Sequence, residues 1–471
     1  MLVSQAITWT ATLILTAALG RHLGPAGFGK LYLAMSFGLL FGVLVEFGID
    51  RQLVRAVARD HAAAGSYLSA AVLIKTILAV ALYPIMLATV VALGYDQTVE
   101  RLVGTYGLTL LTIGLSTSLG AVYQGAQSML HAAVATVIEK VFLSCAALAL
   151  FAAGFGVFEI AVAMVLSSTL AVMWKALFIS RVVRVSWRPD AGAIRALLRS
   201  TPPFLLYGIL ASVYYRADTV LLSLLTDATV VGWYGAAYRL LDTMVFLPTI
   251  VSVAVMFPIL AKLSLGSREP LREAMGKGIQ AIAVVGVPIC VGLFLVADPV
   301  VRLIYGDQGF GPAAEALRWL MPGLFALYLN SILTVSLISV NRERRLMVIA
   351  GLSCVLNIGL NLVLIPRYQQ VAAAAVTSTT ELFILGCLLL TLRDVLVPRA
   401  FVSVLKASTA AAVMAIVLTP LRSLPVPTIV MIGVAVYVIS GYVLRLVDSA
   451  DVRSLRAAII GRAAATVGNE S

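Results

Sequence analysis

Charged residues are scarce in this chain of 471 residues, and their scarcity decides its class. Asp, Glu, Lys and Arg make up 12% of the sequence, whereas 61% is hydrophobic and the mean hydropathy is +1.02. A soluble protein of this length needs a much more polar surface. A bilayer core is crossed by about 20 apolar residues in a helix, because a helix satisfies its own backbone polar groups. The composition therefore predicts an all-α polytopic membrane protein.

Cysteine and histidine are also rare, which excludes several kinds of site. The four cysteines lie singly inside apolar stretches and the three histidines are scattered, so no disulfide or zinc spacing is present. The sequence contains no nucleotide-binding loop, no hydrolase nucleophile motif and no carboxylate pair with hydrolase spacing. The longest polar gap, 181–201, is too short for a catalytic domain. We therefore predict no metal, no cofactor and no enzymatic activity.

Fourteen apolar stretches are long enough to cross a bilayer. The first lacks the basic leader and cleavage site of a secretory signal peptide, so we expect it to be retained as a span. The predicted spans cover residues 1–20, 30–49, 67–93, 102–124, 129–153, 157–180, 202–225, 229–260, 278–297, 314–340, 346–365, 371–392, 401–420 and 428–446.

The basic residues predict the orientation of these spans. Of the 34 Lys and Arg residues, 22 lie in or beside the gaps that follow even-numbered spans or in the C-terminal tail. Seven lie in or beside the gaps that follow odd-numbered spans, and five lie inside spans. Because basic residues collect on the cytoplasmic side, both termini are predicted to be cytoplasmic. The net charge of +12 is dispersed over short loops, so it does not indicate nucleic-acid binding.

An internal repeat relates the two halves of the chain. Placing Gly29 on Gly232 also aligns Ala34 with Ala237, and each glycine opens a helix after an outer turn. The offset corresponds to six spans, which predicts two six-helix lobes in parallel pseudo-repeat. We predict an N-terminal lobe over 1–180, a basic cytoplasmic linker over 181–201, a C-terminal lobe over 202–392, two extra helices over 393–446 and an amphipathic cytoplasmic tail over 447–471.

Four segments give the chain a family resemblance. They are GRHLGPAGFGKLYLAMSF (20–37) with EFGIDRQLVRAVAR (46–59), YYRADTVLLSLL (214–225) with VGWYGAAYRLLD (231–242), VNRERRLM (340–347), and LNIGLNLVLIPRY (356–368) with VAAAAVTSTT (371–380). The pattern resembles the oligosaccharide and polysaccharide flippases of the multidrug/oligosaccharidyl-lipid/polysaccharide exporter superfamily. The chain departs from this family at QQVAAAA (369–375), where the family usually has glycines.

The resemblance implies a function, a location and partners. It implies a transporter that flips a polyprenyl-pyrophosphate-linked oligosaccharide across a bacterial cytoplasmic membrane by alternating access, for surface polysaccharide export. The implied partners are this lipid-linked oligosaccharide, membrane lipids, a polysaccharide polymerase and glycosyltransferases, without nucleic acid. Two alternatives within the superfamily stay open: a drug/cation antiporter and a flippase for the peptidoglycan precursor lipid II.

Charged residues inside the spans are the candidates for the transport site, because an unpaired charge in lipid is costly. Arg216 and Asp218 are about 200° apart around one helix and cannot pair, whereas Arg239 and Asp242 are three apart and can. We expect Asp218 or Asp242 to neutralise Arg239, which leaves Arg216 facing a wet cavity. The resemblance implies that basic side chains in the cavity hold the anionic lipid carrier, so we predict Arg216, Asp218 and Arg239 as substrate-binding residues.

Six further charged residues are assigned from their positions in the spans. Lys140 and Glu46 are predicted to contact substrate in the central cavity, although Glu46 could instead pair with Arg51 at a helix end. Glu381 and Glu139 are predicted as ion-coupling carboxylates. Lys75 and Lys175 lie near span ends, where a lysine can extend its ammonium to the surface, so we expect both to snorkel to the cytoplasmic interface.

Two basic segments are predicted to lie on the cytoplasmic leaflet. AGAIRALLRS (191–200) and VRSLRAAIIGRAAA (452–465) both have the pattern of an amphipathic helix with arginines on the polar face. Such helices bind anionic headgroups with roughly 1 kcal/mol for each basic residue.

The predicted topology gives a direct test. A tag fused to either terminus should be inaccessible to an antibody added outside intact cells, because both termini are predicted to be cytoplasmic. Permeabilised cells provide the control, since the tag should then be stained. Staining of intact cells would contradict the orientation derived from the basic residues.

Overall fold

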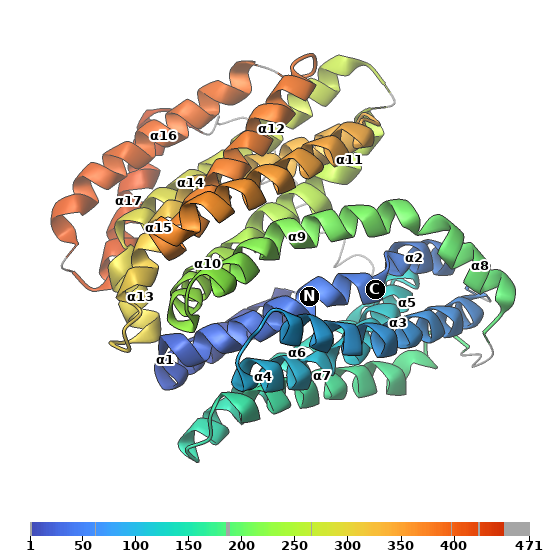
Figure 1. Cartoon of the computed structure of the whole chain (residues 1–471). Coiled ribbons are helices and arrows are strands. Elements are labelled where there is room, and N and C mark those ends of the chain that lie inside the picture. The colour runs from blue at the N-terminus through green and yellow to red at the C-terminus, as the bar shows by residue number, and fades with distance from the viewer. Residues whose placement is uncertain are drawn as a thin grey trace, which may run out of the picture. The chain divides into compact units, whose positions relative to one another are not determined.

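The structure is a computed structural model. It describes residues 2–446 apart from 62, 185–188, 265, 397 and 423. The predicted tail over 447–471 therefore lies outside the described residues. All regular elements in the described ranges are helices (Figure 1). They are α1 (Leu2–Glu46), α2 (Ile49–Arg59), α3 (Ala64–Ala92), α4 (Gln97–Gly107), α5 (Thr109–Gly125), α6 (Leu130–Ala152), α7 (Val157–Ile179), α8 (Ala191–Ser200), α9 (Pro202–Leu225), α10 (Ala228–Thr249), the π-helix η1 (Ile250–Met256), α11 (Phe257–Leu263), α12 (Arg268–Leu295), α13 (Ala297–Tyr305), α14 (Gly311–Ser339), α15 (Glu343–Leu392), α16 (Pro398–Leu418), the short 3₁₀ helix η2 (Thr419–Leu421) and α17 (Val426–Val443).

Twelve helical segments among the described residues are long and apolar enough to cross a membrane, which confirms the all-α polytopic class. Two of them, Ile7–Glu46 and Glu343–Leu392, have 40 and 50 residues. At 1.5 Å per residue, straight helices of that size would be about 60 and 75 Å long, twice a bilayer core or more. Each is broken by a residue with positive φ, Gly24 at 62° and Gln369 at 50°. Both breaks lie between predicted spans, so they favour the predicted number of fourteen, which stays a prediction.

The chain forms two compact units. The first comprises Met1–Thr243, Val301–Leu320 and Met347–Thr380, and the second comprises Met244–Val300, Met321–Leu346 and Glu381–Ser471. Their boundaries fall inside helices and do not test the predicted lobes, which stay a prediction. In the first unit, α6 packs against α1 and α7, and α5 packs against α3 and α7.

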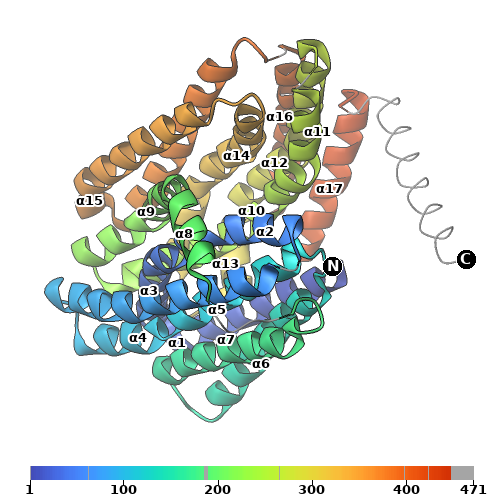
Figure 2. The same cartoon turned by 90° about the vertical axis from the view of Figure 1, so that its right-hand side faces the viewer.

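Two short amphipathic helices, α2 and α8, close one end of the α3–α7 bundle (Figure 1 and Figure 2). Ile49, Leu53 and Val57 recur every four residues along α2 and are fully buried. On α8, Ala193 and Leu197 join the same apolar cluster, whereas Arg195 and Arg199 are exposed. The amphipathic helix predicted for 191–200 is therefore confirmed, and its binding to lipid headgroups stays a prediction.

The second unit is built on α12, α16 and α17, whose inward side chains form one apolar cluster. The VNRERRLM segment (340–347) contributes an ion pair in this unit. Arg342 binds Asp394 through two hydrogen bonds, Nη1 to Oδ1 at 2.9 Å and Nη2 to Oδ2 at 2.6 Å. These bonds hold the pKa of the Asp394 carboxyl at about 2, so the pair remains ionised at neutral pH. The motif thus fastens the start of α15 to the turn that follows its end.

Each of the two glycines aligned by the internal repeat packs against the backbone of the helix that contains the other. A Cβ on Gly29 would collide with the carbonyl oxygen of Ala228 and lie 2.7 Å from the amide nitrogen of Gly232. A Cβ on Gly232 would collide with the carbonyl group of Pro25 and lie 3.1 Å from its Cα. The contact is reciprocal, because each glycine faces the backbone carbonyl four residues before the other. Only glycine allows the backbones of α1 and α10 to approach this closely.

This close approach predicts that Gly232→Ala destabilises the fold by about 1–3 kcal/mol, because backbone atoms cannot give way to the added methyl group. Gly359→Ala is the matched control, since nothing lies within 4 Å of the Cβ that it would add. Thermal unfolding of the purified proteins in detergent measures both changes. Equal transition temperatures for the two variants would contradict the packing described for α1 and α10.

Candidate functional site

Two arginines flank the buried Tyr32 in the first unit. Arg216 on α9 donates from Nη1 to the Tyr32 hydroxyl over 2.7 Å, and its guanidinium carbon lies 5.6 Å from the ring centres of Tyr32 and Tyr238. The guanidinium carbon of Arg239 on α10 lies 6.0 Å from the Tyr32 ring centre. Tyr32 therefore accepts a hydrogen bond from one cation and offers its ring to both. We refer to Tyr32, Arg216, Arg239 and Asp242 as the arginine cluster.

The arginine cluster contains more positive than negative charge. Asp242 Oδ2 lies 3.8 Å from Arg216 Nη2, which is an ion pair without a short hydrogen bond. The side chains of Arg216 and Asp242 are 15% and 37% exposed, so this carboxylate is accessible. Among the described residues, Arg239 has no carboxylate within 4.0 Å, and its Nη2 lies 3.0 Å from the thioether sulfur of Met35. The cluster thus holds two guanidiniums and one carboxylate, which is loosely paired with Arg216.

Local sequence features explain how these side chains converge. Asp227 caps the start of α10, because its Oδ1 accepts the backbone N–H groups of Thr229 and Val230 at 2.7 and 3.1 Å. The close contact of Gly29 with Gly232 then sets α10 directly against α1, which brings Tyr32 beside Arg239.

Asp218 faces away from the arginine cluster. Its side chain accepts hydrogen bonds from the Tyr234 hydroxyl, the Thr219 amide at 2.7 Å and the Thr377 hydroxyl at 3.4 Å. The residue is only 2% exposed. The expectation that Arg216 and Asp218 lie on different sides of α9 is confirmed. Asp218 is held by neutral donors from α9, α10 and α15. It interacts with Arg216 electrostatically but forms no ion pair within 4.0 Å with either predicted substrate-binding arginine.

The predicted ion pairing was wrong in one respect. We expected Asp218 or Asp242 to neutralise Arg239 and Arg216 to remain unpaired. The structure pairs Asp242 with Arg216 and leaves Arg239 against the Met35 sulfur. The three-residue spacing of Arg239 and Asp242 permits a pair, but the neighbouring helix α9 supplies a competing arginine.

The other predicted site residues lie elsewhere. Lys140 Nζ binds Glu139 Oε1 at 2.9 Å, so these two candidates neutralise each other on α6. Glu46 is the last residue of α1, and no described residue forms an ion pair with it. Glu381 belongs to the second unit, where its Oε2 accepts a hydrogen bond from Asn330 at 2.8 Å and the residue is 5% exposed.

Two lysines that the sequence placed at the surface are turned inward instead. The ammonium group of Lys75 is 2.5 Å from Asp50 Oδ1 and 2.8 Å from Thr117 Oγ1, and its side chain is fully buried. Lys175 donates to the carbonyl and hydroxyl oxygens of Ser116 at 3.2 and 2.7 Å. The snorkelling prediction was therefore wrong for both. The polar residues of α5, among them Ser116 and Thr117, are the sequence signal that this helix could receive them.

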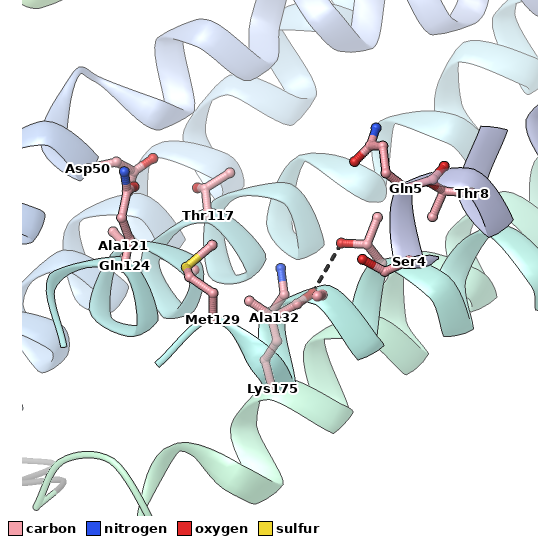
Figure 3. A pocket seen from close by; sticks show the side chains of 13 residues that line it. Ser4, Gln5, Thr8, Asp50, Thr117, Ala121, Gln124, Met129, Ala132 and Lys175 are labelled. Carbon is pink, nitrogen blue, oxygen red and sulfur yellow. Dashed lines mark hydrogen bonds between the residues drawn. The ribbon is translucent and has the colours of Figure 1, made fainter. Parts of the chain in front are cut away.

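A pocket of about 490 Å³ with several polar lining residues opens beside Lys175 (Figure 3). Lys175 and Asp50 line it, together with residues from α1, α5 and α6. The remaining lining residues are Ser4, Gln5, Thr8, Thr117, Gly120, Ala121, Gln124, Met129, Ala132, Ala133 and Thr136. None of the predicted site residues lines this pocket.

Comparison with known proteins places this architecture in a family. A family model described as polysaccharide biosynthesis protein matches residues 18–309. No curated protein matches the chain. Among solved structures, the lipid II flippase MurJ in an inward closed conformation is similar, with a TM-score of 0.78 and 14% identity over 94% of this chain and 97% of that one.

Multidrug transporters share the fold as well. An inward-facing MATE family transporter of the MOP superfamily aligns with a TM-score of 0.66 and 16% identity, over 84% of this chain and 98% of that one. A eukaryotic MATE transporter aligns with a TM-score of 0.57 and 14% identity, over 87% and 98% of the two chains. These similarities establish the fold that the sequence resemblance predicted.

The ion pair of the arginine cluster predicts a coupled effect on stability. Arg216→Gln should destabilise the protein more than Arg239→Gln, because only the former removes the hydrogen bond to Tyr32 and leaves Asp242 without a cation. In a double-mutant cycle, Asp242→Asn should offset part of the Arg216→Gln loss, with a coupling energy of roughly 0.5–3 kcal/mol. Thermal or denaturant unfolding in detergent measures these terms, and additive effects of the two substitutions would contradict the pair.

Proposed function

Because the chain belongs to the polysaccharide biosynthesis protein family, we propose that it flips a polyprenyl-pyrophosphate-linked oligosaccharide across a membrane. The direction proposed is from the cytoplasmic to the outer leaflet of a bacterial cytoplasmic membrane, with both termini in the cytoplasm. The protein is a transporter and not an enzyme. A sugar headgroup cannot cross hydrocarbon unaided, so the transporter must provide a polar path while the lipid tail stays in the bilayer.

The excess of positive charge in the arginine cluster is the observation that supports this proposal. Arg239 has no carboxylate partner among the described residues, and Asp242 holds Arg216 only at 3.8 Å. A pyrophosphate group offers several anionic oxygens, and guanidinium groups bind such oxygens in pairs. We assign Arg239 as the primary pyrophosphate contact. Arg216 would release the carboxylate of Asp242 and bind the pyrophosphate instead.

Transport by alternating access is part of the same proposal. The substrate would bind to one arrangement of the two lobes and be released from another. The two arrangements are states in equilibrium, and the substrate shifts their populations. The predicted fourteen spans, the two predicted lobes and the cytoplasmic linker belong to this proposal. Glycosyltransferases that build the lipid-linked oligosaccharide and a polymerase that consumes it are the proposed functional partners.

Lipid II is the second candidate substrate, and one observation favours it. The MurJ structure, whose title names a lipid II flippase, is similar over 94% of this chain. A pyrophosphate-binding arginine cluster would serve either lipid. The family match favours the polysaccharide precursor. A cationic drug is disfavoured as substrate, because it requires an excess of acidic groups where this cluster has an excess of basic ones.

The proposal predicts that Arg239→Ala strongly slows flipping while the protein still folds. Proteoliposomes would contain a fluorescent polyprenyl-pyrophosphate-linked oligosaccharide, and an impermeant quencher would report the probe in the outer leaflet. Loss of one charge-assisted contact of about 1.5–3 kcal/mol predicts a fall in the transport rate of roughly tenfold or more. Arg239→Lys should recover only part of the rate, because an ammonium group lacks the paired donors of guanidinium.

Arg302→Ala is the matched control, since the Arg302 side chain is 76% exposed and lies outside the cluster. It should flip the probe at the wild-type rate. A wild-type rate for Arg239→Ala would contradict the assignment of this residue. Absence of flipping by the wild-type protein with lipid-linked oligosaccharide and with lipid II would contradict the proposed function.

A further inference from the structure

The pocket beside Lys175 contains a cation that forms no ion pair with any described residue. Lys75 and Lys175 approach α5 from α3 and α7 and bind the neighbouring residues Thr117 and Ser116. Lys75 is also paired with Asp50 at 2.5 Å. Lys175 binds only the neutral oxygens of Ser116 among the described residues. An ammonium group inside a helical bundle is costly unless it is paired or hydrated, so its position requires an explanation.

The two acids that could neutralise Lys175 are engaged elsewhere. Glu139 interacts with Lys175 electrostatically, but no ion pair within 4.0 Å joins them. The Glu139 carboxylate is bound to Lys140 at 2.9 Å. Asp50, the one carboxylate that lines the pocket, is neutralised by Lys75. The pocket therefore has a net positive charge that comes from Lys175.

The remaining polar groups in the pocket have complementary roles. The hydroxyls of Thr8 and Thr136 donate their single proton to backbone carbonyls of their own helices, at 2.9 and 3.1 Å. They can therefore only accept hydrogen bonds from a ligand. The amide groups of Gln5 and Gln124 can donate, as can the Lys175 ammonium. The pocket thus offers acceptors for hydroxyl groups and donors for an anion.

This combination selects a class of ligand. A cavity of about 490 Å³ lies within the range of small-molecule sites. Its small residues Gly120, Ala121, Ala132 and Ala133 provide the space, and its polar residues surround that space (Figure 3). A sugar provides hydroxyl donors for the threonine oxygens, and an attached phosphate provides acceptors for Lys175 and the glutamine amides.

We propose that this pocket binds a sugar phosphate, with Lys175 as the residue that holds the phosphate. The pocket is lined by residues near the span ends that the basic residues place in the cytoplasm, and Asp50 of α2 is among them. It shares no residue with the arginine cluster. The source of the ligand rests on the proposed function. In that case the pocket would hold the headgroup of the lipid-linked oligosaccharide before the headgroup reaches the arginine cluster. A free sugar phosphate is the other source of the same chemistry.

Binding to the purified full-length protein tests this proposal. The protein would be placed in phosphatidylcholine nanodiscs and titrated calorimetrically with glucose 1-phosphate and with a farnesyl-pyrophosphate-linked N-acetylglucosamine. Glucose and inorganic phosphate serve as probes for the two halves of the ligand. We expect at least one sugar phosphate probe to bind more tightly than either half alone. Repeating the titration in an Arg216→Gln, Arg239→Ala background removes the contribution of both arginines of the arginine cluster.

Two substitutions should weaken that binding, for different reasons. Lys175→Gln removes the charge and should raise the dissociation constant roughly tenfold or more, as expected for a lost charge-assisted hydrogen bond. Gln124→Leu removes a neutral donor at an exposed position, so it tests the pocket even if Lys175→Gln fails to fold. Lys277→Gln is the matched control, because it removes one lysine on an exposed face of the other unit.

The outcomes separate the pocket from the proposed function. Binding of the lipid-linked probe alone, or of glucose 1-phosphate alone, supports the pocket and identifies the source of its ligand. Absence of binding by both sugar phosphates, or binding that Lys175→Gln and Gln124→Leu leave unchanged, overturns it. Lys175-dependent binding by a protein that flips neither lipid would overturn only the proposed function, whereas flipping without such binding would overturn only the pocket.

Discussion

The cost of a positive charge inside a membrane protein is the constraint on which this structure depends. A lysine or arginine in a spanning helix must be paired, hydrated or supplied with a ligand. Lys75 meets the requirement within the protein, through Asp50 and Thr117. Arg216 meets it in part, through Tyr32 and a loosely held Asp242. Arg239 and Lys175 meet it least, and they mark the two places where we propose that an anion binds.

The aromatic ring of Tyr32 makes this incomplete compensation tolerable. Its ring attracts both guanidinium groups, and its hydroxyl accepts a hydrogen bond from Arg216. A tyrosine stabilises a cation without neutralising it, so the site keeps its attraction for a substrate. A second carboxylate in the same position would stabilise the empty protein more strongly and would repel a pyrophosphate. The same close packing that brings α10 against α1 thus serves both the fold and the site.

Hydropathy and spacing predicted the class of the protein because they report local properties. The length of each apolar stretch reflects the thickness of the bilayer, and the breaks at Gly24 and Gln369 fall where polar residues interrupt those stretches. The opposite orientation of Arg216 and Asp218 followed from helix geometry alone. The alignment of Gly29 with Gly232 identified two residues that the structure brings into mutual contact.

Partners from other helices could not be predicted in this way. The spacing of Arg239 and Asp242 allowed a pair, but Arg216 on α9 competes successfully for the same carboxylate. Lys75 and Lys175 have the length to reach the surface, and nothing in their own helices shows that Thr117 and Ser116 receive them instead. The pocket depends on α1, α2, α5, α6 and α7 together, so no single segment contains a signal for it.

The central claim is that this chain carries lipid-linked saccharides across the membrane. The most direct measurement is deletion of its gene in the native host, followed by extraction of lipid-linked saccharides and analysis of the surface glycans. The account predicts loss of one surface glycan and accumulation of its lipid-linked unit on the cytoplasmic side, with restoration by the wild-type gene and not by Arg239→Ala. An unchanged glycan profile together with new sensitivity to cationic drugs would contradict it.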